Sequence, residues 1–226
     1  MVRDQGRQST QIKMAVLIAA VMMAAGCSSG GSSSPAVPAQ TCTTCMTFVT
    51  AATYSGDIKT TGGKANAIAS ADSLCMADAN KPAGGGTYKA MLVDGVNRVA
   101  CTTANCGGGA GEHIDWVFKP STTYLRSDGT TTVMTTNTAG IWDFIDPISD
   151  PHNLLATFDT AASRYRTGLD WDWRAVAAGY RCGGGWTDGT VAAFDDYGFG
   201  DRADDSAIGG GASTCDLPKN LLCIEQ

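Results

Sequence analysis

Cysteines constrain the fold of this chain more than any other feature of its sequence. Nine of the 226 residues are cysteines, and all but one of them follow residue 41. An even number of cysteines in an exported chain is typical of a disulfide framework, and eight cysteines allow 105 pairings. The sequence therefore predicts a domain whose loops are covalently cross-linked. The cysteines concerned are Cys42, Cys45, Cys75, Cys101, Cys106, Cys182, Cys215 and Cys223.

The N-terminus carries the export signal on which this interpretation depends. Arg3, Arg7 and Lys13 precede the apolar run "MAVLIAAVMMAAG" at 14–26. A basic start followed by an apolar run too short to span a bilayer comfortably is typical of a secretory signal. We therefore interpret residues 1–26 as a signal peptide of the lipoprotein type. An ordinary cleaved signal or a short membrane anchor is the alternative.

The end of the apolar run carries the lipoprotein interpretation. The letters "AAGC" at 24–27 resemble a bacterial lipobox, although Ala24 stands where leucine is more usual. The resemblance implies that Cys27 is the lipidated first residue of the mature chain, with several acyl chains, palmitate among them, as a stable anchor. Ser28, rather than an aspartate, follows this cysteine. The lipobox resemblance thus also implies sorting to the outer membrane and exposure at the cell surface.

The rest of the chain divides into a tether and one folded domain. Residues 27–41 comprise the lipidated cysteine and a Gly/Ser/Pro segment that has nothing to bury, which predicts a flexible tether. Residues 42–226 are long enough for one domain. The net charge of −6 and the pI of about 4.7 give a surface that repels phosphate backbones. We therefore expect a membrane-anchored protein without a nucleic-acid partner.

Apolar periodicity predicts a few regular elements in the first half of the domain. In the segment at 64–80, Ile68, Ala71, Cys75 and Ala79 recur at helical spacing, which places Ser70 and Asp72 on the outer side of the predicted helix. The second half is expected to consist mostly of loops with short strands. Predicted strands cover 45–56, 87–95 and 220–225, and a hairpin covers 123–136 around Asp128-Gly129.

One acidic segment between Cys182 and Cys215 fits no regular element. In "FDDYGFGDRADD" at 194–205, five aspartates and an arginine are interleaved with three aromatic residues. Apolar residues recur there at neither 2 nor 3.6 residues, which predicts an irregular loop rather than a strand or an amphipathic helix. We interpret the aspartates as solvated and expect no metal, because their spacing matches no EF-hand loop. Calcium is the alternative, held by Asp195, Asp196, Asp201, Asp204 and Asp205.

Several segments of the domain resemble a known family. They are "TFVTAATYSGDI", "AIASADSLCMADAN", "GTYKAMLVDG", "IWDF", "CGGGWTDGTV" and "LLCIEQ". They resemble bacterial lipoproteins of the domain of unknown function 1554 family, a C-type lectin-like branch, over about 46–226 and most strongly at both ends. The resemblance implies an α+β, C-type lectin-like fold with small antiparallel sheets, one or two helices, long loops and stabilising disulfides.

The order of the cysteines also resembles that of the lectin-like domain. A helical cysteine, a distant pair and a last cysteine that Glu225 follows imply the pairs Cys75–Cys223 and Cys182–Cys215. Two local bridges then remain, Cys42–Cys45 and Cys101–Cys106. Zinc bound by these four residues, or a redox role for the first two, are the alternatives.

Motifs for catalysis or sugar binding are missing from the sequence. It has no Gly-x-Ser-x-Gly elbow, HExxH helix or phosphate loop, so we expect neither an enzyme nor a cofactor. His113 and His152 lie beside carboxylates, where a general base could sit, but we interpret them as surface histidines in turns. The proline-containing calcium motifs of sugar-binding lectins are also missing. Trp186, in the partial motif "WTD", is expected in the core.

Aromatic and charged residues in the second half predict a ligand-binding surface. Aromatic side chains beside charged groups offer a large contact area at low entropic cost. We expect a non-enzymatic adhesin-like or receptor-like module for a protein or glycan ligand, and an envelope lipoprotein without a ligand is the alternative. At least one of these rings is expected in the core. The predicted set is Trp171, Trp173, Tyr180, Phe194, Asp195, Asp196, Tyr197, Phe199, Asp201, Arg202, Asp204 and Asp205.

A further resemblance concerns how this surface could vary. Some lectin-fold lipoproteins are targets of diversity-generating retroelements, which mutate adenines in a C-terminal coding segment. The amino acids reachable by such changes crowd residues 192–208, directly before the segment "CDLPKNLLCIEQ". The resemblance implies that this segment is diversified genetically.

Overall fold

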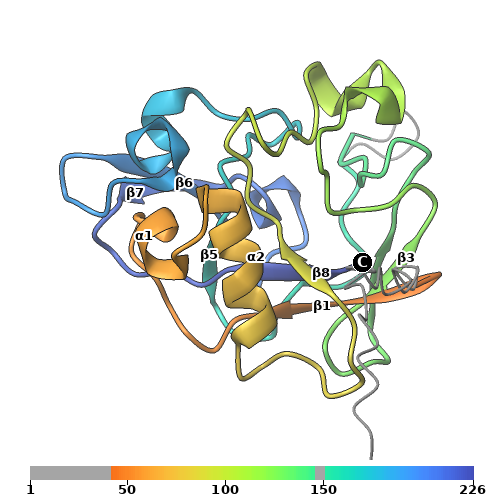
Figure 1. Cartoon of the computed structure of the whole chain (residues 1–226). Helices are drawn as coiled ribbons and strands as arrows, with labels where there is room; N and C mark the ends of the chain where they lie inside the picture. Colours follow the sequence, from red (N-terminus) through yellow and green to blue (C-terminus); the bar gives the residue numbers. More distant parts are fainter. Residues whose placement is uncertain (1–41, 146–150) are drawn as a thin grey trace, which may run out of the picture. The chain divides into compact units, whose positions relative to one another are not determined.

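The computed structural model describes residues 42–145 and 151–226 of the chain, all within one compact unit. The predicted signal peptide at 1–26, the lipidation of Cys27 and the tether at 27–41 lie outside the described residues. Two sheets and two α-helices form the described part (Figure 1). An α+β domain with small sheets, few helices and disulfides, as expected from the sequence, is therefore confirmed.

The larger sheet joins the two ends of the domain. Its five strands run in the order β2-β8-β1-β3-β4, so the first and last strands are neighbours. Phe48 of β1 pairs with Cys223 of β8 in antiparallel register. The expectation of purely antiparallel sheets is wrong at one pair, because β1 and β3 run parallel. The strands are β1 (Thr44–Val49), β2 (Tyr88–Ala90), β3 (Thr123–Leu125), β4 (Thr132–Thr135) and β8 (Leu222–Glu225).

The predicted elements of this sheet are confirmed in place but not in length. The predicted hairpin around Asp128-Gly129 is the antiparallel pair β3–β4. There the Asp128 carboxylate accepts the backbone N–H groups of Thr130 and Thr131, as turn aspartates commonly do. Of the residues 87–95 predicted as a strand, only Tyr88–Ala90 form one, which is β2.

Two helices, α1 (Ile58–Gly62) and α2 (Ala67–Ala77), pack against each other, and α2 also packs against β2 and β8 of the larger sheet (Figure 1). Helix α2 begins after Asn66, whose side chain accepts the N–H of Ala69 at 2.8 Å, a typical N-cap contact. The predicted face is buried at Ile68, Ala71 and Cys75, whereas Ala79 lies exposed beyond the helix end. The sequence did not predict α1.

Ser70 corrects the expected orientation of α2. We expected this residue on the outer side, but it is fully buried. Its Oγ donates to the carbonyl of Lys59 at 3.1 Å and accepts the N–H of Lys64 at 3.0 Å. A small hydroxyl is tolerated there because both of its hydrogen-bonding roles are satisfied. It therefore fixes α1 against α2.

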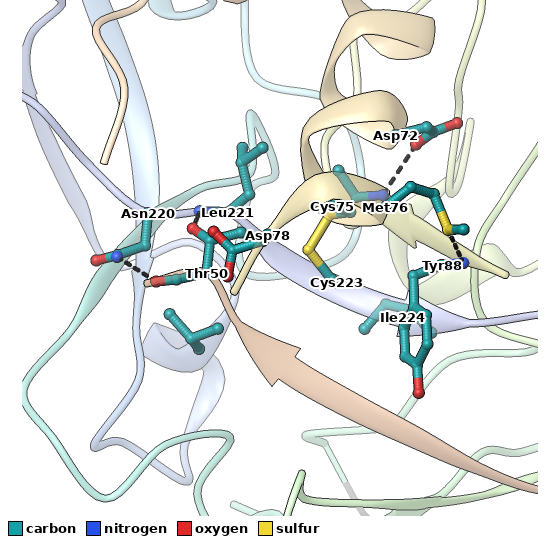
Figure 2. Close-up of a disulfide and its surroundings, with 12 residues drawn as sticks. Thr50, Asp72, Cys75, Met76, Asp78, Tyr88, Asn220, Leu221, Cys223 and Ile224 are labelled. Atoms are coloured by element: carbon teal, nitrogen blue, oxygen red, sulfur yellow. Dashed lines mark hydrogen bonds between the residues drawn. A yellow bond between two sulfur atoms is a disulfide. The ribbon is translucent and has the colours of Figure 1, made fainter. Parts of the chain in front are cut away.

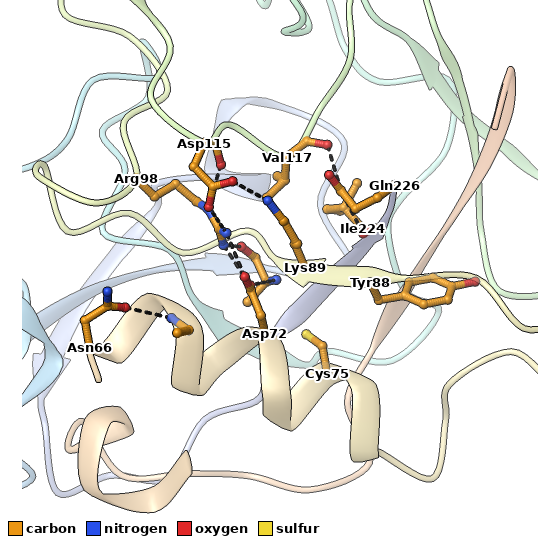
Figure 3. A network of polar contacts seen from close by, with 12 residues as sticks. Asn66, Asp72, Cys75, Tyr88, Lys89, Arg98, Asp115, Val117, Ile224 and Gln226 are labelled. Carbon is orange, nitrogen blue, oxygen red and sulfur yellow. Dashed lines mark hydrogen bonds and ion pairs between the residues drawn. The ribbon is translucent and has the colours of Figure 1, made fainter. Parts of the chain in front are cut away.

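Asp72 was also expected on the outer side of the helix, but its carboxylate pairs with a buried cation. Arg98 is fully buried, and its guanidinium donates to both carboxylate oxygens of Asp72 at 2.9 and 2.8 Å (Figure 3). The same group donates to Asp115 at 2.5 Å and to the carbonyl of Ala90 at 2.7 Å. Lys89 pairs with Asp115 as well. This network joins α2 to β2 and to the loop around Asp115.

A disulfide between α2 and β8 joins helix and sheet (Figure 2). The Cα atoms of Cys75 and Cys223 lie 5.7 Å apart, and both residues are fully buried. Next to it, the N–H of Tyr88 donates to the sulfur of Met76. The structure also contains the other three expected pairs: Cys42–Cys45, Cys101–Cys106 and Cys182–Cys215. None of these sulfur atoms is free to bind zinc.

The smaller sheet overturns the prediction of an irregular loop at 194–199, whereas 200–205 contains no strand, as expected. Phe194–Phe199 is strand β6, the central strand of an antiparallel sheet in the order β5-β6-β7. The sequence shows no alternation because a charged residue, Asp195, stands on the buried face of β6, while the aromatic Phe194 is exposed. The partners of Asp195 are distant in sequence. Tertiary contacts thus override local propensity. The flanking strands are β5 (Arg164–Arg166) and β7 (Gly211–Thr214).

Short helical turns complete the described chain. One of them, η4, starts at Cys182, and both this cysteine and Trp186 at its end have positive φ angles, 44° and 58°. Gly56 packs directly against the disulfide of Cys182, and a side chain there would collide with sulfur. The turns are η1 (Ala104–Cys106), η2 (Gly109–Glu112), η3 (Ala178–Tyr180), η4 (Cys182–Trp186) and η5 (Asp205–Ala207).

Two tryptophans lie at the centre of the core. Trp186 is fully buried, and its indole N–H donates to the carbonyl of Val93 at 2.8 Å, which confirms the core position expected for it. Trp173 is equally buried and donates to the carbonyl of Trp142 at 2.8 Å. Its assignment to the ligand-binding set is therefore wrong.

Candidate functional site

Strand β6 distributes the predicted binding residues over different surfaces. Successive side chains of a strand point to opposite faces of the sheet. Asp195, Tyr197 and Phe199 therefore share one face of β6, and Phe194 and Asp196 share the other. The remaining predicted residues of the acidic segment follow the end of the strand. The twelve predicted residues thus do not form one site.

The face that carries Asp195 is a buried charge network. Asp195 is fully buried and pairs with Arg166, which is also fully buried. Lys219 Nζ lies 3.2 Å from Asp195 Oδ1, and Ser213 Oγ donates to the same oxygen at 3.1 Å. Arg166 also donates to the carbonyl of Leu217 at 2.7 Å. Asp195 is therefore a structural residue, and its assignment to ligand binding is wrong.

The ion pairs of this network offset part of the free energy that burying its charged groups costs. Burial lowers the pKa of Arg166 and of Lys219, because a desolvated cation is disfavoured. The carboxylate of Asp195 raises both pKa values in turn. Three charged groups from β5, β6 and the segment before β8 thus depend on one another.

Tyr197 packs into the same face and is only 7% exposed. Its ring lies 4.8 Å from Lys219 Nζ and 5.3 Å from the Phe199 ring, and the Arg164 guanidinium lies 5.6 Å from its centroid. A side chain at Gly211 would approach the Tyr197 ring to 2.5 Å. We expected at least one ring of the predicted binding set in the core, and Tyr197 is such a ring. This segment is thus packed against the rest of the domain, and removing Tyr197 would cost stability.

The opposite face of β6 forms a cavity, which we call the β6 pocket. Its volume is about 260 Å³. The side chains of Tyr180 and Phe194 are 47% and 46% exposed, and their ring centroids lie 6.4 Å apart. Two large aromatic residues are thus presented to solvent next to the hollow. The lining residues are Asp170, Val176, Ala177, Tyr180 and Asp196.

Asp196 is the chemically unusual group of the β6 pocket. Its Oδ1 is buried and has no hydrogen-bond partner among the described residues. Burial raises the pKa of Asp196 to about 7, the N–H of Tyr197 opposes this, and the carboxylates of Asp170 and Asp195 raise it further. A carboxyl group with this pKa changes charge near neutral pH, which marks a functional-site candidate.

We expect Asp196→Asn to stabilise the protein at pH 8 and to change little at pH 4. The pKa of Asp196 is raised above its value in the unfolded chain, so its contribution to stability is full at low pH and is lost as pH rises through about 7. Asparagine cannot ionise and avoids this loss. We expect a gain of about 1–2 kcal/mol at pH 8, discounted for partial solvation. Thermal melting of both proteins between pH 4 and 8 measures it, and parallel curves would contradict it.

The other predicted residues lie outside the β6 pocket. Trp171 is exposed, and its backbone N–H donates to the Asp170 carboxylate at 2.8 Å, which places it beside a lining residue. Asp204 is partly buried and caps η5 by accepting the N–H of Ser206 at 3.2 Å. Asp201, Arg202 and Asp205 are exposed beyond β6.

Both histidines are partly buried and contact backbone carbonyls. The ring nitrogens of His113 face the carbonyl oxygens of Ala100 and Ala139. His152 Nδ1 lies 2.9 Å from the carbonyl of Asp143, and its ring lies 4.4 Å from the Trp142 ring. The interpretation of both as surface histidines is therefore only partly right.

The described residues contain neither a cluster of metal ligands nor a membrane-spanning helix. Within 42–145 and 151–226, no three His, Cys, Asp or Glu side chains converge closely enough to bind a metal ion. Over the same part of the chain, no helix has the length and apolar character needed to cross a membrane.

Sequence reasoning missed three residues of the β6 pocket. Asp170, Val176 and Ala177 come from the loop between β5 and η3, and Leu169 and Ala175 bridge this loop on itself. In this loop, Trp171 was the one residue that pointed to the pocket from the sequence, because it directly follows the lining residue Asp170. No periodicity marks the other two.

The described residues define a class of protein: a disulfide-stabilised α+β domain in which a small sheet presents an acidic, aromatic pocket. The chain belongs to the family described as "Protein of unknown function (DUF1554)", which matches residues 58–202. The match contains the whole β6 pocket but stops before β7 and β8. The terminal "LLCIEQ", a strong part of the resemblance, lies outside it. No curated protein matches the chain in sequence.

Proposed function

We propose that this protein is a surface-displayed lipoprotein that binds a ligand without catalysis, through the β6 pocket and the aromatic residues beside it. The observation that carries the proposal is the pair of exposed rings, Tyr180 and Phe194, at the edge of a cavity. Exposed aromatic residues are uncommon on a surface without partners and dominate the energy of binding surfaces. The ligand is proposed to be a protein or a glycan.

The C-type lectin-like fold is part of this proposal. Two features support it: the disulfide from Cys75 in α2 to Cys223 in β8, and the pair Cys182–Cys215. The pairing of β1 with β8 brings the two ends of the domain together. These cross-links support a rigid platform for the β6 pocket.

The lipoprotein anchor and its location rest on the N-terminal sequence. The basic start, the short apolar run and the "AAGC" ending support export and lipidation at Cys27. An outer-membrane anchor followed by a flexible tether would hold the domain away from the bilayer. Mass spectrometry of the mature protein, showing a diacylated or triacylated Cys27, tests this part.

Diversification by a retroelement remains a separate proposal. Within 192–208, exposed positions such as Phe194 and Arg202 could vary freely. Asp195, Tyr197 and Gly198 are buried, so varying them would cost stability. A near-copy of the coding DNA that differs chiefly at adenines, beside a reverse transcriptase gene, would support the proposal. The lack of any such repeat would end it.

We expect the double substitution Tyr180→Ala and Phe194→Ala to abolish ligand capture without unfolding the domain. Aromatic anchors at the centre of an interface are worth about 2 kcal/mol or more each, so removing both should lower affinity by about 500-fold or more. The full chain is immobilised and screened against protein and glycan arrays, and the variant is compared on each ligand found.

A matched control removes an exposed apolar residue elsewhere. Leu155 is 64% exposed, and Leu155→Ala should leave both capture and melting temperature unchanged. Capture that survives the double substitution would contradict the proposed site. It would favour an envelope lipoprotein in which β6 serves packing, as Asp195 and Tyr197 do.

A further inference from the structure

The charges around the β6 pocket are unbalanced. Asp170 and Asp196 both line it, and the charged groups that shift the pKa of Asp196 are carboxylates. The basic side chains on neighbouring segments are engaged elsewhere. Arg166 pairs with Asp195, Arg174 pairs with Asp172, and Arg181 donates to the carbonyl of Asp94.

One carboxylate oxygen in the pocket lacks the partner that burial normally demands. Asp196 Oδ1 is shielded from solvent and accepts no hydrogen bond from the described residues. Such a group costs about 1–3 kcal/mol, and more when it is charged. A positive charge held in the pocket beside the Asp196 carboxyl group would stabilise its ionised form and so offset this cost.

The rest of the pocket fits the shape of a basic side chain. Val176 and Ala177 offer apolar surface on which a methylene stem can lie. Tyr180 contributes a ring whose face attracts cations. The cavity of about 260 Å³ is below the usual range of about 300–1,000 Å³ for small-molecule sites, which favours a single side chain.

We propose that the β6 pocket binds a lysine or arginine side chain presented by a protein ligand. The inference rests on the proposed binding function and specifies its ligand: Asp196 and Asp170 pair with the cation, while Tyr180 and the apolar residues hold its stem. The chain as a whole carries a net charge of −6, which favours the approach of a basic partner.

The test titrates the full chain in detergent micelles with two model compounds. N-acetyl-lysine methylamide carries the cation, and N-acetyl-norleucine methylamide has a similar stem without it. We expect the lysine compound to shift the backbone amide signals of Asp170, Tyr180 and Asp196, with at least about tenfold higher affinity than the norleucine compound. Equal responses, or no response to either at tens of millimolar, would overturn the inference.

Variants assign the effect to the two carboxylates. Asp170→Asn and Asp196→Asn should each weaken binding of the lysine compound by about tenfold, and the exposed Asp216→Asn should not. Affinity in the wild type should rise by up to about tenfold between pH 6 and 8 as Asp196 ionises, and this rise should vanish in Asp196→Asn. Unchanged binding in both pocket variants would overturn the inference.

A panel of peptides separates this inference from the proposed function. The panel varies only the charge of one central residue, and capture is measured with and without the Tyr180→Ala and Phe194→Ala changes. Capture that depends on these rings but not on charge would overturn the cation and keep the binding function. A lysine compound that binds in the pocket, while capture ignores the rings, would support the cation and overturn the proposed mode of capture.

Discussion

Replacing Cys75 and Cys223 together by alanine is expected to lower the free energy of unfolding by about 5 kcal/mol. The two residues are 148 positions apart, and a cross-link over so long a segment removes much of the conformational entropy of the unfolded chain. For a domain of this size the melting temperature should fall by about 10–20 °C. Thermal and urea unfolding under non-reducing conditions measure the change.

The Cys42–Cys45 disulfide provides the matched control. Its cysteines are separated by 3 positions, so the same entropy argument gives about 2 kcal/mol for Cys42→Ala with Cys45→Ala. Cys45 is buried like both cysteines of the longer bridge, whereas Cys42 is partly buried, so the pairs differ chiefly in loop length and to a lesser extent in burial. Equal losses for the two double variants would show that packing, rather than loop closure, dominates.

Asp195→Ala is expected to cost about 3–5 kcal/mol. The substitution leaves Arg166 and Lys219 buried without their carboxylate, and an uncompensated buried charge is strongly destabilising. The melting temperature should fall by about 6–20 °C, and β6 should lose hydrogen-exchange protection first.

Asp216→Ala is the control for this variant, because Asp216 also acts on the charge of Arg166 but is exposed. We expect it to change stability by less than about 0.5 kcal/mol. The double variant Arg166→Met with Asp195→Ala should lose less than the sum of the two single losses, since the pair interacts directly. An additive double variant, or a harmless Asp195→Ala, would contradict the structural role of this network.

The two aspartates of β6 differ in how their buried charges are compensated. Asp195 is compensated by two cations and a hydroxyl. Asp196, the next residue, lines a cavity and has a buried oxygen that no described residue contacts by a hydrogen bond. A local feature that costs stability without visible compensation is what binding sites often contain. We therefore expect Asp196→Asn both to raise stability at pH 8 and to weaken binding of the proposed cation, because both effects come from the same buried carboxyl group.

Several features of the fold followed from the sequence because their causes are local. The Asp128-Gly129 hairpin, the helix around Cys75 and the terminal strand each depend on neighbouring residues. The four disulfide pairs agree with the family resemblance and with the spacing of the local bridges. The resemblance to the lectin-like fold also predicted the core position of Trp186, which the structure confirms.

Only the tertiary structure decided what the segment at 194–205 is. Alternation reveals a strand when apolar residues occupy its buried face and polar residues its exposed face, but in β6 the buried position is Asp195 and the exposed one is Phe194. The charge of the buried Asp195 is paired with Arg166 and Lys219, 29 and 24 positions away, which no local pattern encodes. The β6 pocket likewise needs Asp170 from another loop to stand beside Asp196. The sequence alone therefore identified the acidic and aromatic residues of this segment. Which face of the strand each side chain occupies, what it contacts and how deeply it is buried depended on the packing of distant segments.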